Sequence, residues 1–480
     1  GTFSDRSDAA GLNGFGGGLH LIQGDYNNDG YLDVFILRGA WHGNNGNIPN
    51  SLLRNNGNAT FTDVTIEAGL GKIHLPTQTG AWADFDNDGD LDLYIGNESE
   101  RNVVAPTQLF KNNGDGTFSD VAQEAGVCDT LFVKGATWGD IDNDHYPDLY
   151  VSVAGGNNKM YRNNRNGTFT DIAPKVNLIK PKGSFATWFW DYNNDGNIDL
   201  WVGSSTGPVG TLLLYPNGIG NPANDLQTQK LQDQIIVEPM KLYEGTGTGQ
   251  FRDVAQERGL NYPSQPMGSN FGDLNNDGFL DFYLGTGDVD YAEIRPNVMF
   301  LNERSSRFVN ITMAGGFGHL QKGHGVSFAD LDNDGDQDVY IQMGGAQWAD
   351  KFYDAIFENP GFDNNVLTVI LEGRQSNRSA IGARLKATFQ ENGLQRHVYR
   401  HVDSGSSFGN NPLRQYIGIG KSTHVKHLEV FWPKTGKTQK FSNIDANQTV
   451  KIIEGADQFQ VLSLKILKMG SKQEPVKPST

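Results

Sequence analysis

The feature that most constrains this 480-residue chain is an acidic motif, Asp-x-[Asp/Asn]-x-Asp-x-x-x-Asp, which occurs six times. Successive copies begin 51 to 59 residues apart, except for one interval of 82 residues after the fourth copy. A period of this length is typical of proteins that repeat one supersecondary unit, such as solenoids and propellers. The copies begin at Asp25, Asp84, Asp140, Asp191, Asp273 and Asp330. The sequence therefore predicts a repeat protein in which the long interval holds an insertion, roughly residues 206–240.

Each motif has the composition of a calcium loop. Oxygen-bearing side chains stand at positions 1, 3, 5 and 9, and the main-chain carbonyl of position 7 can add a further ligand, which suits a hard cation such as Ca²⁺. An EF-hand would need a bidentate Glu at position 12, but that position is aliphatic in all six copies, so EF-hands are excluded. Carboxylates two residues apart repel one another unless a cation joins them. We therefore expect about six Ca²⁺ ions.

The predicted ligands follow one scheme in every loop. They are Asp25, Asn27, Asp29, Tyr31 and Asp33 in the first loop; Asp84, Asp86, Asp88, Asp90 and Asp92 in the second; Asp140, Asp142, Asp144, Tyr146 and Asp148 in the third; Asp191, Asn193, Asp195, Asn197 and Asp199 in the fourth; Asp273, Asn275, Asp277, Phe279 and Asp281 in the fifth; and Asp330, Asp332, Asp334, Asp336 and Asp338 in the sixth. The second and sixth loops carry the most carboxylates and are predicted to bind most tightly. In the third loop His145 replaces the glycine of position 6, which is strained if φ is positive there.

The segments around the loops are predicted to be strands. Each loop is followed by β-branched and aromatic residues such as Val34-Phe35-Ile36, the composition of a buried strand. Sixty glycines, nearly twice the usual share of about 7%, favour many short strands joined by turns. A second echo, Phe61-Thr62-Asp63-Val64 in the first copy, closes each repeat but the sixth, and residues 1–5 carry a similar Phe-Ser-Asp. We therefore predict four-stranded blades over residues 1–361, six being favoured over seven, with the N-terminal strand completing the last blade and closing the ring.

These motifs resemble the FG-GAP/VCBS calcium-binding β-propeller repeats of integrin α-chains and many secreted proteins. The phrase at residues 112–126, Asn-Asn-Gly-x-Gly-Thr-Phe-Ser-Asp-Val-Ala-x-Glu-Ala-Gly, is especially similar to the family related to cartilage acidic protein 1. The resemblance implies an all-β, calcium-binding propeller. Because related propellers often have seven blades, it also keeps that number open.

The acidic loops stop after Gly361, and a different pattern follows. Six short, partly alternating segments predict a small β-sandwich or barrel over residues 362–455. They are residues 367–371, 384–389, 397–401, 414–419, 428–432 and 449–453. The stretches at 377–384, 404–406, 431–433 and 447–449 resemble the ASPIC/UnbV domain, for which the resemblance implies no established chemistry. Residues 456–480 are expected to form a polar, mobile tail.

Composition and charge exclude several classes of function. Thirty-nine Lys and Arg against 56 Asp and Glu give a net charge of −17, which argues against nucleic-acid binding. The longest apolar runs are far shorter than the roughly 18 residues of a membrane span. The single cysteine, Cys128, excludes an internal disulfide and a multi-cysteine zinc site. Since the calcium sites would be mostly empty in the cytosol, we expect a secreted, extracellular, periplasmic or cell-surface location.

Two further features are candidates for chemistry. Gly405–Gly409 fits the Gly-x-Ser-x-Gly pattern of hydrolases but lacks the strand-turn-helix context. Six residues before the loops, at the expected rim of the central channel, stand Lys134 and His324, and His20 is close by. This rim is the best place for a further ligand or transition metal, although a solvated rim is the simpler interpretation. Aromatic residues two positions before five of the loops, such as Trp82, are interpreted as packing between blades.

The sequence favours an extracellular binding or adhesion module whose partner is a protein or a glycan. The alternatives are an enzyme with a site in the propeller channel and a structural subunit of a cell-surface assembly. No catalytic residue is predicted, and the enzyme is the less favoured alternative. The sequence does not identify the partner or the oligomeric state.

Overall fold

The computed structural model describes residues 3–100, 102–205, 238–262, 265–287, 295–344, 352–404 and 408–469. These residues form 31 strands, one 3-10 turn (η1, Gly43–Asn45) and one short helix (α1, Ala122–Ala125), which confirms the all-β prediction. No helix in these ranges is both long and apolar enough to span a bilayer. Most of the predicted insertion, residues 206–237, lies outside the described residues.

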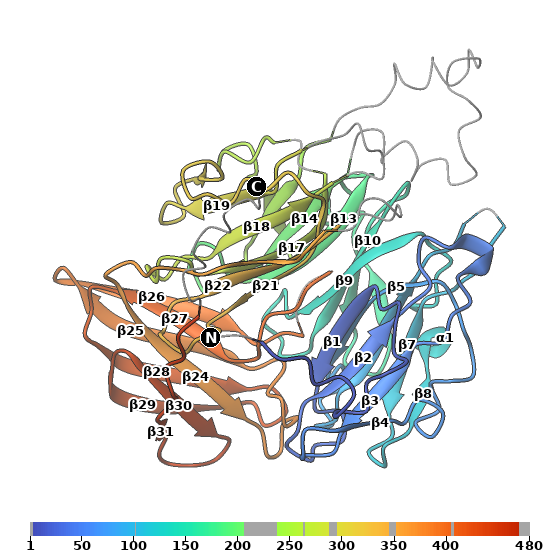
Figure 1. Ribbon diagram of the computed structural model, residues 1–480, viewed down its shortest axis with the longest axis horizontal. Coiled ribbons are helices and arrows are strands. Elements are labelled where there is room, and N and C mark those ends of the chain that lie inside the picture. Colours follow the sequence, from blue (N-terminus) through green and yellow to red (C-terminus); the bar gives the residue numbers. More distant parts are fainter. Residues whose placement is uncertain are drawn as a thin grey trace, which may run out of the picture.

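Six antiparallel sheets follow one another along the chain and form what we call the six-sheet array (Figure 1). Their strands are β1 His20–Gly24, β2 Asp33–Leu37, β3 Ser51–Asn55 and β4 Phe61–Asp63; β5 Thr77–Ala83, β6 Asp92–Asn97, β7 Gln108–Asn112 and β8 Phe118–Asp120; β9 Val133–Gly139, β10 Asp148–Val153, β11 Lys159–Asn163 and β12 Phe169–Asp171; β13 Ser184–Trp190, β14 Asp199–Ser204, β15 Lys241–Gly245 and β16 Phe251–Asp253; β17 Pro266–Gly272, β18 Asp281–Thr286, β19 Val298–Asn302 and β20 Phe308–Asn310; and β21 Gly323–Ala329, β22 Asp338–Met343 and β23 Ala355–Phe357. Every acidic motif joins the first two strands of its sheet, as predicted.

The sheets pack as blades do, through their first strands. β1 packs on β5, β5 on β9, β9 on β13, β13 on β17 and β17 on β21. All seven residues of β5, β9 and β13 are buried. Trp82, Trp138, Phe189 and Phe328, which precede the loops, are at most 5% exposed. The rings of Trp82, Trp138 and Phe189 contact Phe35, Tyr94 and Tyr150 of the preceding sheets, which agrees with the predicted packing. The fifth aromatic residue of the set, Phe271, is partly buried and contacts Trp188 of β13.

The predicted closure of the ring by the N-terminus is wrong for the described residues. The sixth sheet has three strands, β21 to β23, and residues 3–5 form no strand. Instead, Asp5 accepts a hydrogen bond from the main chain of Ser7 (2.8 Å), and the following turn binds the first sheet, where the Phe61 N–H donates to the Ala10 carbonyl (2.9 Å). Gly1 and Thr2 lie outside the described residues. The N-terminal segment is thus held by a local turn and by the first sheet, whereas sequence similarity assigned it to the sixth sheet.

The C-terminal domain consists of two four-stranded sheets with strand orders β27-β24-β30-β31 and β26-β25-β28-β29. Its strands are β24 Asn365–Glu372, β25 Arg384–Glu391, β26 Leu394–His401, β27 Gln415–Gly420, β28 His424–Trp432, β29 Lys437–Asp445, β30 Gln448–Ile453 and β31 Gln460–Leu462. All six predicted segments are strands. The sequence analysis missed β29, whose exposed face is polar. It also assigned residues 460–462 to a mobile tail, whereas they form β31, which pairs with β30.

A segment of the C-terminal domain, residues 408–412, joins the first and last sheets of the array. The Phe408 carbonyl accepts the N–H of Val326 on β21 (3.1 Å), and the Asn411 carbonyl accepts a hydrogen bond from the Gln23 side chain on β1 (2.8 Å). The Phe408 ring is 2% exposed and stacks on Phe185 of β13 at 5.5 Å between centroids. The seam between the first and last sheets is therefore bridged by the C-terminal domain.

We expect Phe408→Ala to destabilise the protein by about 3–5 kcal/mol, because the truncation leaves a cavity among the first strands of the array. Chemical denaturation at fixed calcium measures the change. The matched control is Leu394→Ala in the same domain, whose side chain is 71% exposed and whose truncation should stay within about 0.5 kcal/mol. Equal stabilities of the two variants would show that the Phe408 ring does not contribute to packing.

Candidate metal loops

The position-1 and position-5 aspartates shape all six loops in the same way. The position-1 carboxylate accepts the main-chain N–H groups of positions 5 and 6 at 2.7–3.2 Å. The position-5 carboxylate accepts the N–H of position 7 at 2.7–3.0 Å. Each loop is therefore wound around its own carboxylates, which brings their remaining lone pairs into one small volume.

The position-9 aspartates anchor each loop to its sheet. One carboxylate oxygen accepts the N–H of position 2, and the other accepts an N–H at the end of the third strand or, in the sixth sheet, two residues after it, at 2.7–3.3 Å. These side chains are at most 2% exposed. They are Asp33, Asp92, Asp148, Asp199, Asp281 and Asp338. A buried carboxylate that ties three backbone segments together holds the loop at a fixed place on its sheet.

The residues fit a cation such as Ca²⁺. Three groups each place three carboxylate oxygens within 4.8 Å of one another: Asp84, Asp86 and Asp92; Asp140, Asp142 and Asp148; and Asp330, Asp332 and Asp334. One side-chain oxygen of Asp86 and one of Asp142 are buried without a hydrogen-bond partner. Such an oxygen is costly unless a ligand satisfies it. The other three loops have Asn at position 3, which offers an amide oxygen instead. The full ligand sets, including the position-7 carbonyls, stay a prediction.

In the absence of a cation, burial raises the pKa values of several of these carboxylates. Loss of solvation raises the pKa of Asp33 to about 7 and, together with the negative charge of Asp88, raises that of Asp84 to about 7. The pKa values of Asp191 and Asp273 also rise to about 7 for the same leading reason. A bound cation favours the charged form and lowers such pKa values. Metal and protons thus compete for the same oxygens.

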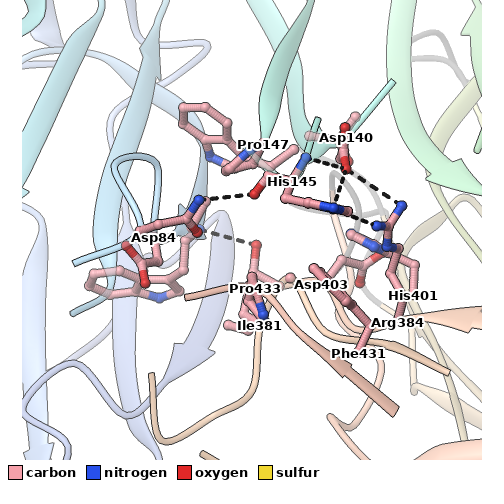
Figure 2. A pocket seen from close by; sticks show the side chains of 17 residues that line it. Asp84, Asp140, His145, Pro147, Ile381, Arg384, His401, Asp403, Phe431 and Pro433 are labelled. Carbon is pink, nitrogen blue, oxygen red and sulfur yellow. Dashed lines mark hydrogen bonds and ion pairs between the residues drawn. The ribbon is translucent and has the colours of Figure 1, made fainter. Parts of the chain in front are cut away.

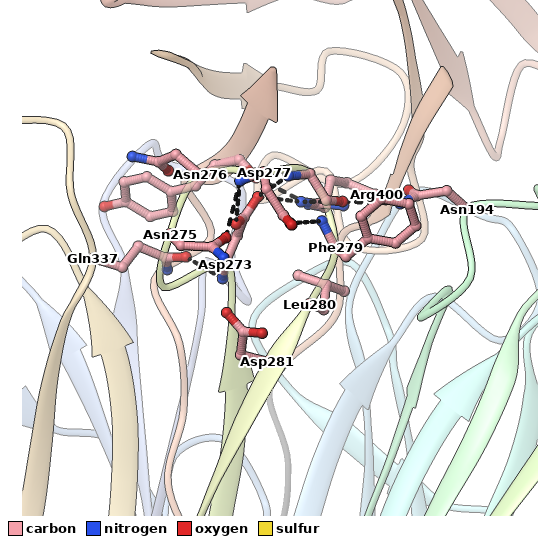
Figure 3. Close-up of polar contacts among 12 residues, drawn as sticks. Asn194, Asp273, Asn275, Asn276, Asp277, Phe279, Leu280, Asp281, Gln337 and Arg400 are labelled. Atoms are coloured by element: carbon pink, nitrogen blue, oxygen red, sulfur yellow. Dashed lines mark hydrogen bonds and ion pairs between the residues drawn. The ribbon is translucent and has the colours of Figure 1, made fainter. Parts of the chain in front are cut away.

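Basic side chains of the chain itself reach some of the loops. Lys111 pairs with Asp86 and, at 3.2 Å, with Asp88 of the second loop. Arg400 of the C-terminal domain is buried and lies 3.3 Å from the carboxylate of Asp273 in the fifth loop (Figure 3). Because Lys111 offsets part of the charge of the second loop, the predicted advantage of that loop in calcium affinity depends on more than its number of carboxylates.

The backbone of the third loop carries the predicted strain. His145 has φ of 75°, whereas the glycines at the same position of the other loops have φ between 90° and 102°. Its ring lies 4.4 Å from that of Phe431, and its Nδ1 is 2.9 Å from the guanidinium of Arg384 (Figure 2). The cavity drawn in Figure 2 has a volume of only about 30 Å³, so it does not hold a substrate-sized molecule. The strained residue, His145, therefore contacts the C-terminal domain through its side chain.

Sequence reasoning missed position 4, which is Asn in all six loops. These residues adopt the left-handed conformation, with φ between 54° and 60°. Asn tolerates this conformation better than most residues. They are Asn28, Asn87, Asn143, Asn194, Asn276 and Asn333. The sequence shows Asn at position 4 of every copy, but the motif that we used to define the loops allowed any residue at this position.

The other candidate sites receive no support from the described residues. Lys134 is fully buried, pairs with Glu98, and lies 3.6 Å from the centroid of the Trp41 ring, while His20 is 3% exposed. No further cluster of metal-ligating side chains is found among the described residues, at the rim that includes His324 or elsewhere. Residues 405–407 of the hydrolase-like pattern lie outside the described ranges. Two of the three rim residues, Lys134 and His20, are therefore part of the packed interior, where the His20 ring stacks on that of Phe408.

Metal-free protein should lose stability as the pH rises from about 5.5 to about 7.5, because the carboxylates have folded-state pKa values above their unfolded value and bind more protons when folded. His401, whose pKa burial lowers to about 4, acts in the opposite direction but is outnumbered by the carboxylates. Thermal unfolding after dialysis against chelator measures the trend. In excess calcium the trend should flatten or reverse, and a metal-free Tm that increases over this interval would contradict the assignment.

Comparison with known families agrees with this arrangement. The model of the FG-GAP-like repeat matches residues 25–95, 84–151, 147–202 and 232–284, and the model named ASPIC and UnbV matches residues 373–459. Cartilage acidic protein 1 of Mus musculus is 23% identical over 425 residues, covering 85% of this chain and 59% of that protein. For the protein of Homo sapiens the values are 24% over 413 residues, 82% and 56%. The chain thus spans less than two thirds of the length of these relatives.

Two solved structures that this chain resembles are remote matches. SapL1 lectin in complex with alpha methyl fucoside aligns with 68% of this chain and 89% of its own, at 10% identity and a TM-score of 0.37. The Dos1 propeller aligns with 82% and 77%, at 10% identity and a TM-score of 0.30. Scores this low support no statement about a shared site. The repeats and the C-terminal domain do identify the chain: it is built of FG-GAP-like repeats followed by an ASPIC and UnbV domain, and it is a distant relative of cartilage acidic protein 1.

Proposed function

We propose that the protein is a calcium-dependent binding module that acts outside the cytoplasm. The observation that carries this proposal is the common hydrogen-bonding scheme of the six acidic loops, which gathers carboxylates in a buried setting at every sheet. Each loop would hold one Ca²⁺ through its carboxylate, amide and position-7 carbonyl oxygens. When bound, the ion supplies the positive charge that the clustered oxygens need.

Calcium would replace the covalent links that the chain lacks. Its single cysteine, Cys128, is exposed. A ligand that binds only the folded state stabilises it by RT ln(1 + [L]/Kd), which is about 2.7 kcal/mol per site at a hundredfold excess over Kd. Six such sites are a large contribution beside the usual stability of about 5–15 kcal/mol. Because only extracellular or periplasmic calcium is high enough to fill weak sites, the proposal includes a location outside the cytoplasm.

The partner is proposed to be an extracellular protein or a glycan. A cavity of about 320 Å³ between the first loop and the C-terminal domain has room for a small polar group. Asp25, Arg378, Arg414 and Lys451 line it, and they offer charges of both signs. Such a surface suits binding, whereas two of the three rim residues considered for the enzyme alternative, Lys134 and His20, are buried.

We expect about six calcium ions per chain by elemental analysis after gel filtration in calcium, and a Tm that falls in chelator. Asp195→Ala should remove one ion, because it deletes the position-5 carboxylate of the fourth loop. The matched control is Asp445→Ala, an exposed aspartate at the end of β29 that should leave the count unchanged. Fewer than four ions in the unaltered protein, or a melting curve indifferent to chelator, would refute calcium binding.

A further inference from the structure

The C-terminal domain contacts every one of the six acidic loops. Beginning with the first loop, the contacts are the N–H of Arg378 with the Asn28 side chain (2.8 Å), the Lys434 ammonium with the Asp88 carbonyl, the Arg384 guanidinium with the Asn143 side chain (2.6 Å), the N–H of Tyr399 with the Asn194 side chain (3.0 Å), the Arg396 guanidinium with the Asp277 carbonyl (2.8 Å) and the Arg414 guanidinium with the Asn333 side chain (3.1 Å). The domain thus lies across the face of the array that carries the loops.

These contacts depend on the shape of the loops as well as on their charge, since four of the six donors are Lys or Arg side chains. The acceptors in all six are neutral, either main-chain carbonyls or side-chain amides, and four of them belong to the position-4 asparagines. Among the described residues, the domain forms ion pairs with loop carboxylates in the third and fifth loops, by Arg384 at 3.5 Å from Asp140 and by Arg400 at 3.3 Å from Asp273. A neutral acceptor is in place only when the loop backbone keeps the conformation seen here, wound around its carboxylates, which we call closed.

The same asparagines also link each of the first five loops to the next sheet of the array, and the sixth loop to the segment after β31. The amide nitrogen of Asn28 donates to the carbonyl of Gly89 (3.1 Å) and to Asp90 (2.7 Å) in the second loop. The equivalent bonds run from Asn87 to the His145 carbonyl (2.9 Å), from Asn143 to the Gly247 carbonyl (3.2 Å), from Asn194 to the Gly278 carbonyl (2.9 Å), from Asn276 to the Gly335 carbonyl (3.3 Å) and from Asn333 to the Lys465 carbonyl (3.2 Å).

The donors and acceptors of these bonds lie between predicted metal-ligand positions. Four of the six are carbonyls of position 6, which lies between ligand positions 5 and 7 of the receiving loop. The donor stands at position 4, between ligand positions 3 and 5 of its own loop. The last bond leaves the array and reaches Lys465 in the segment after β31, so the series ends in the C-terminal domain. Opening of the first, second, fourth or fifth loop would therefore remove a bond to the next loop, whereas the third loop reaches only Gly247 in the turn between β15 and β16 of the fourth sheet.

We propose that the position-4 asparagines are positioning residues that couple neighbouring metal loops to one another and to the ASPIC and UnbV domain, so that loop filling and domain docking form one cooperative event. This inference rests on the proposed function that the loops bind Ca²⁺. An ion that binds the closed loop more tightly than the open one favours the docked domain, and by linkage docking raises calcium affinity by the same factor. Charge alone would act in the opposite direction, since calcium competes with the arginines for the loops.

Hydrogen exchange gives a direct readout, because the N–H groups of Arg378 and Tyr399 are donated to Asn28 and Asn194. In the full chain, both amides should exchange about tenfold more slowly in calcium than in chelator, as expected for hydrogen bonds released on local opening. A calcium titration followed by this exchange should be steep, with a Hill coefficient above about 2. Faster exchange in calcium would show that charge dominates and would overturn the proposal.

Two substitutions at Asn194 separate its two bonds. Asn194→Gly removes both while still permitting the left-handed backbone, so it should speed exchange at Tyr399 about tenfold and lower the Hill coefficient. Asn194→Asp keeps the acceptor for Tyr399 but loses the donor to Gly278, so it should preserve Tyr399 protection and still lower the Hill coefficient. The control is Asn392→Gly, an exposed residue with φ of 52° in the turn between β25 and β26.

The calcium count separates failure of this inference from failure of the proposed function. If the unaltered protein binds no calcium, the proposed function fails. If it binds about six ions and Asn194→Gly changes neither the Hill coefficient nor Tyr399 exchange, the coupling is refuted while calcium binding stands. A variant that keeps its ions but loses cooperativity and Tyr399 protection supports the coupling.

Discussion

The buried position-9 carboxylate is the interaction on which the rest of the structure depends. In each sheet it begins the second strand, accepts one N–H from its own loop and accepts a second from the end of the third strand or, in the sixth sheet, from two residues after it. Taking an ionised carboxylate out of water costs several kcal/mol unless hydrogen bonds and a counter-charge compensate. The main-chain donors supply part of that compensation, and the remaining negative charge is what makes a cation favourable at every sheet.

The sequence predicted the local features well because their causes are local. Alternating apolar segments, the spacing of the aspartates and the glycine of position 6 are sufficient for the strands, the loops and the positive φ found at His145. The N-terminal Phe3-Ser4-Asp5 was assigned to the sixth sheet by similarity alone. It joins none, because the turn after it binds Phe61 of the first sheet. Which of two equivalent edges a short segment meets is decided by tertiary contacts.

The remaining features could not be predicted because they join residues far apart in the chain. The asparagine at position 4 of every loop was visible in the sequence, yet its role needs two partners, such as Gly278 and Tyr399 for Asn194, which lie 84 and 205 residues away. Phe408 likewise reads as an ordinary loop residue until its ring is found against Phe185. Periodicity identifies the repeating unit, but it carries no information about an element that occurs once and contacts every repeat.

The two regions that sequence patterns separate near Gly361 share one core. A single cluster of buried side chains includes Ile22 and Trp82 of the first two sheets together with Leu367 and Trp432 of the C-terminal domain. Apolar area buried between the regions stabilises both, at about 25 cal/mol per Å². The boundary seen in sequence therefore marks a change of repeat pattern and not a gap in packing. Because the same domain also bridges the seam and contacts all six loops, its docking is part of how the array is held in one shape.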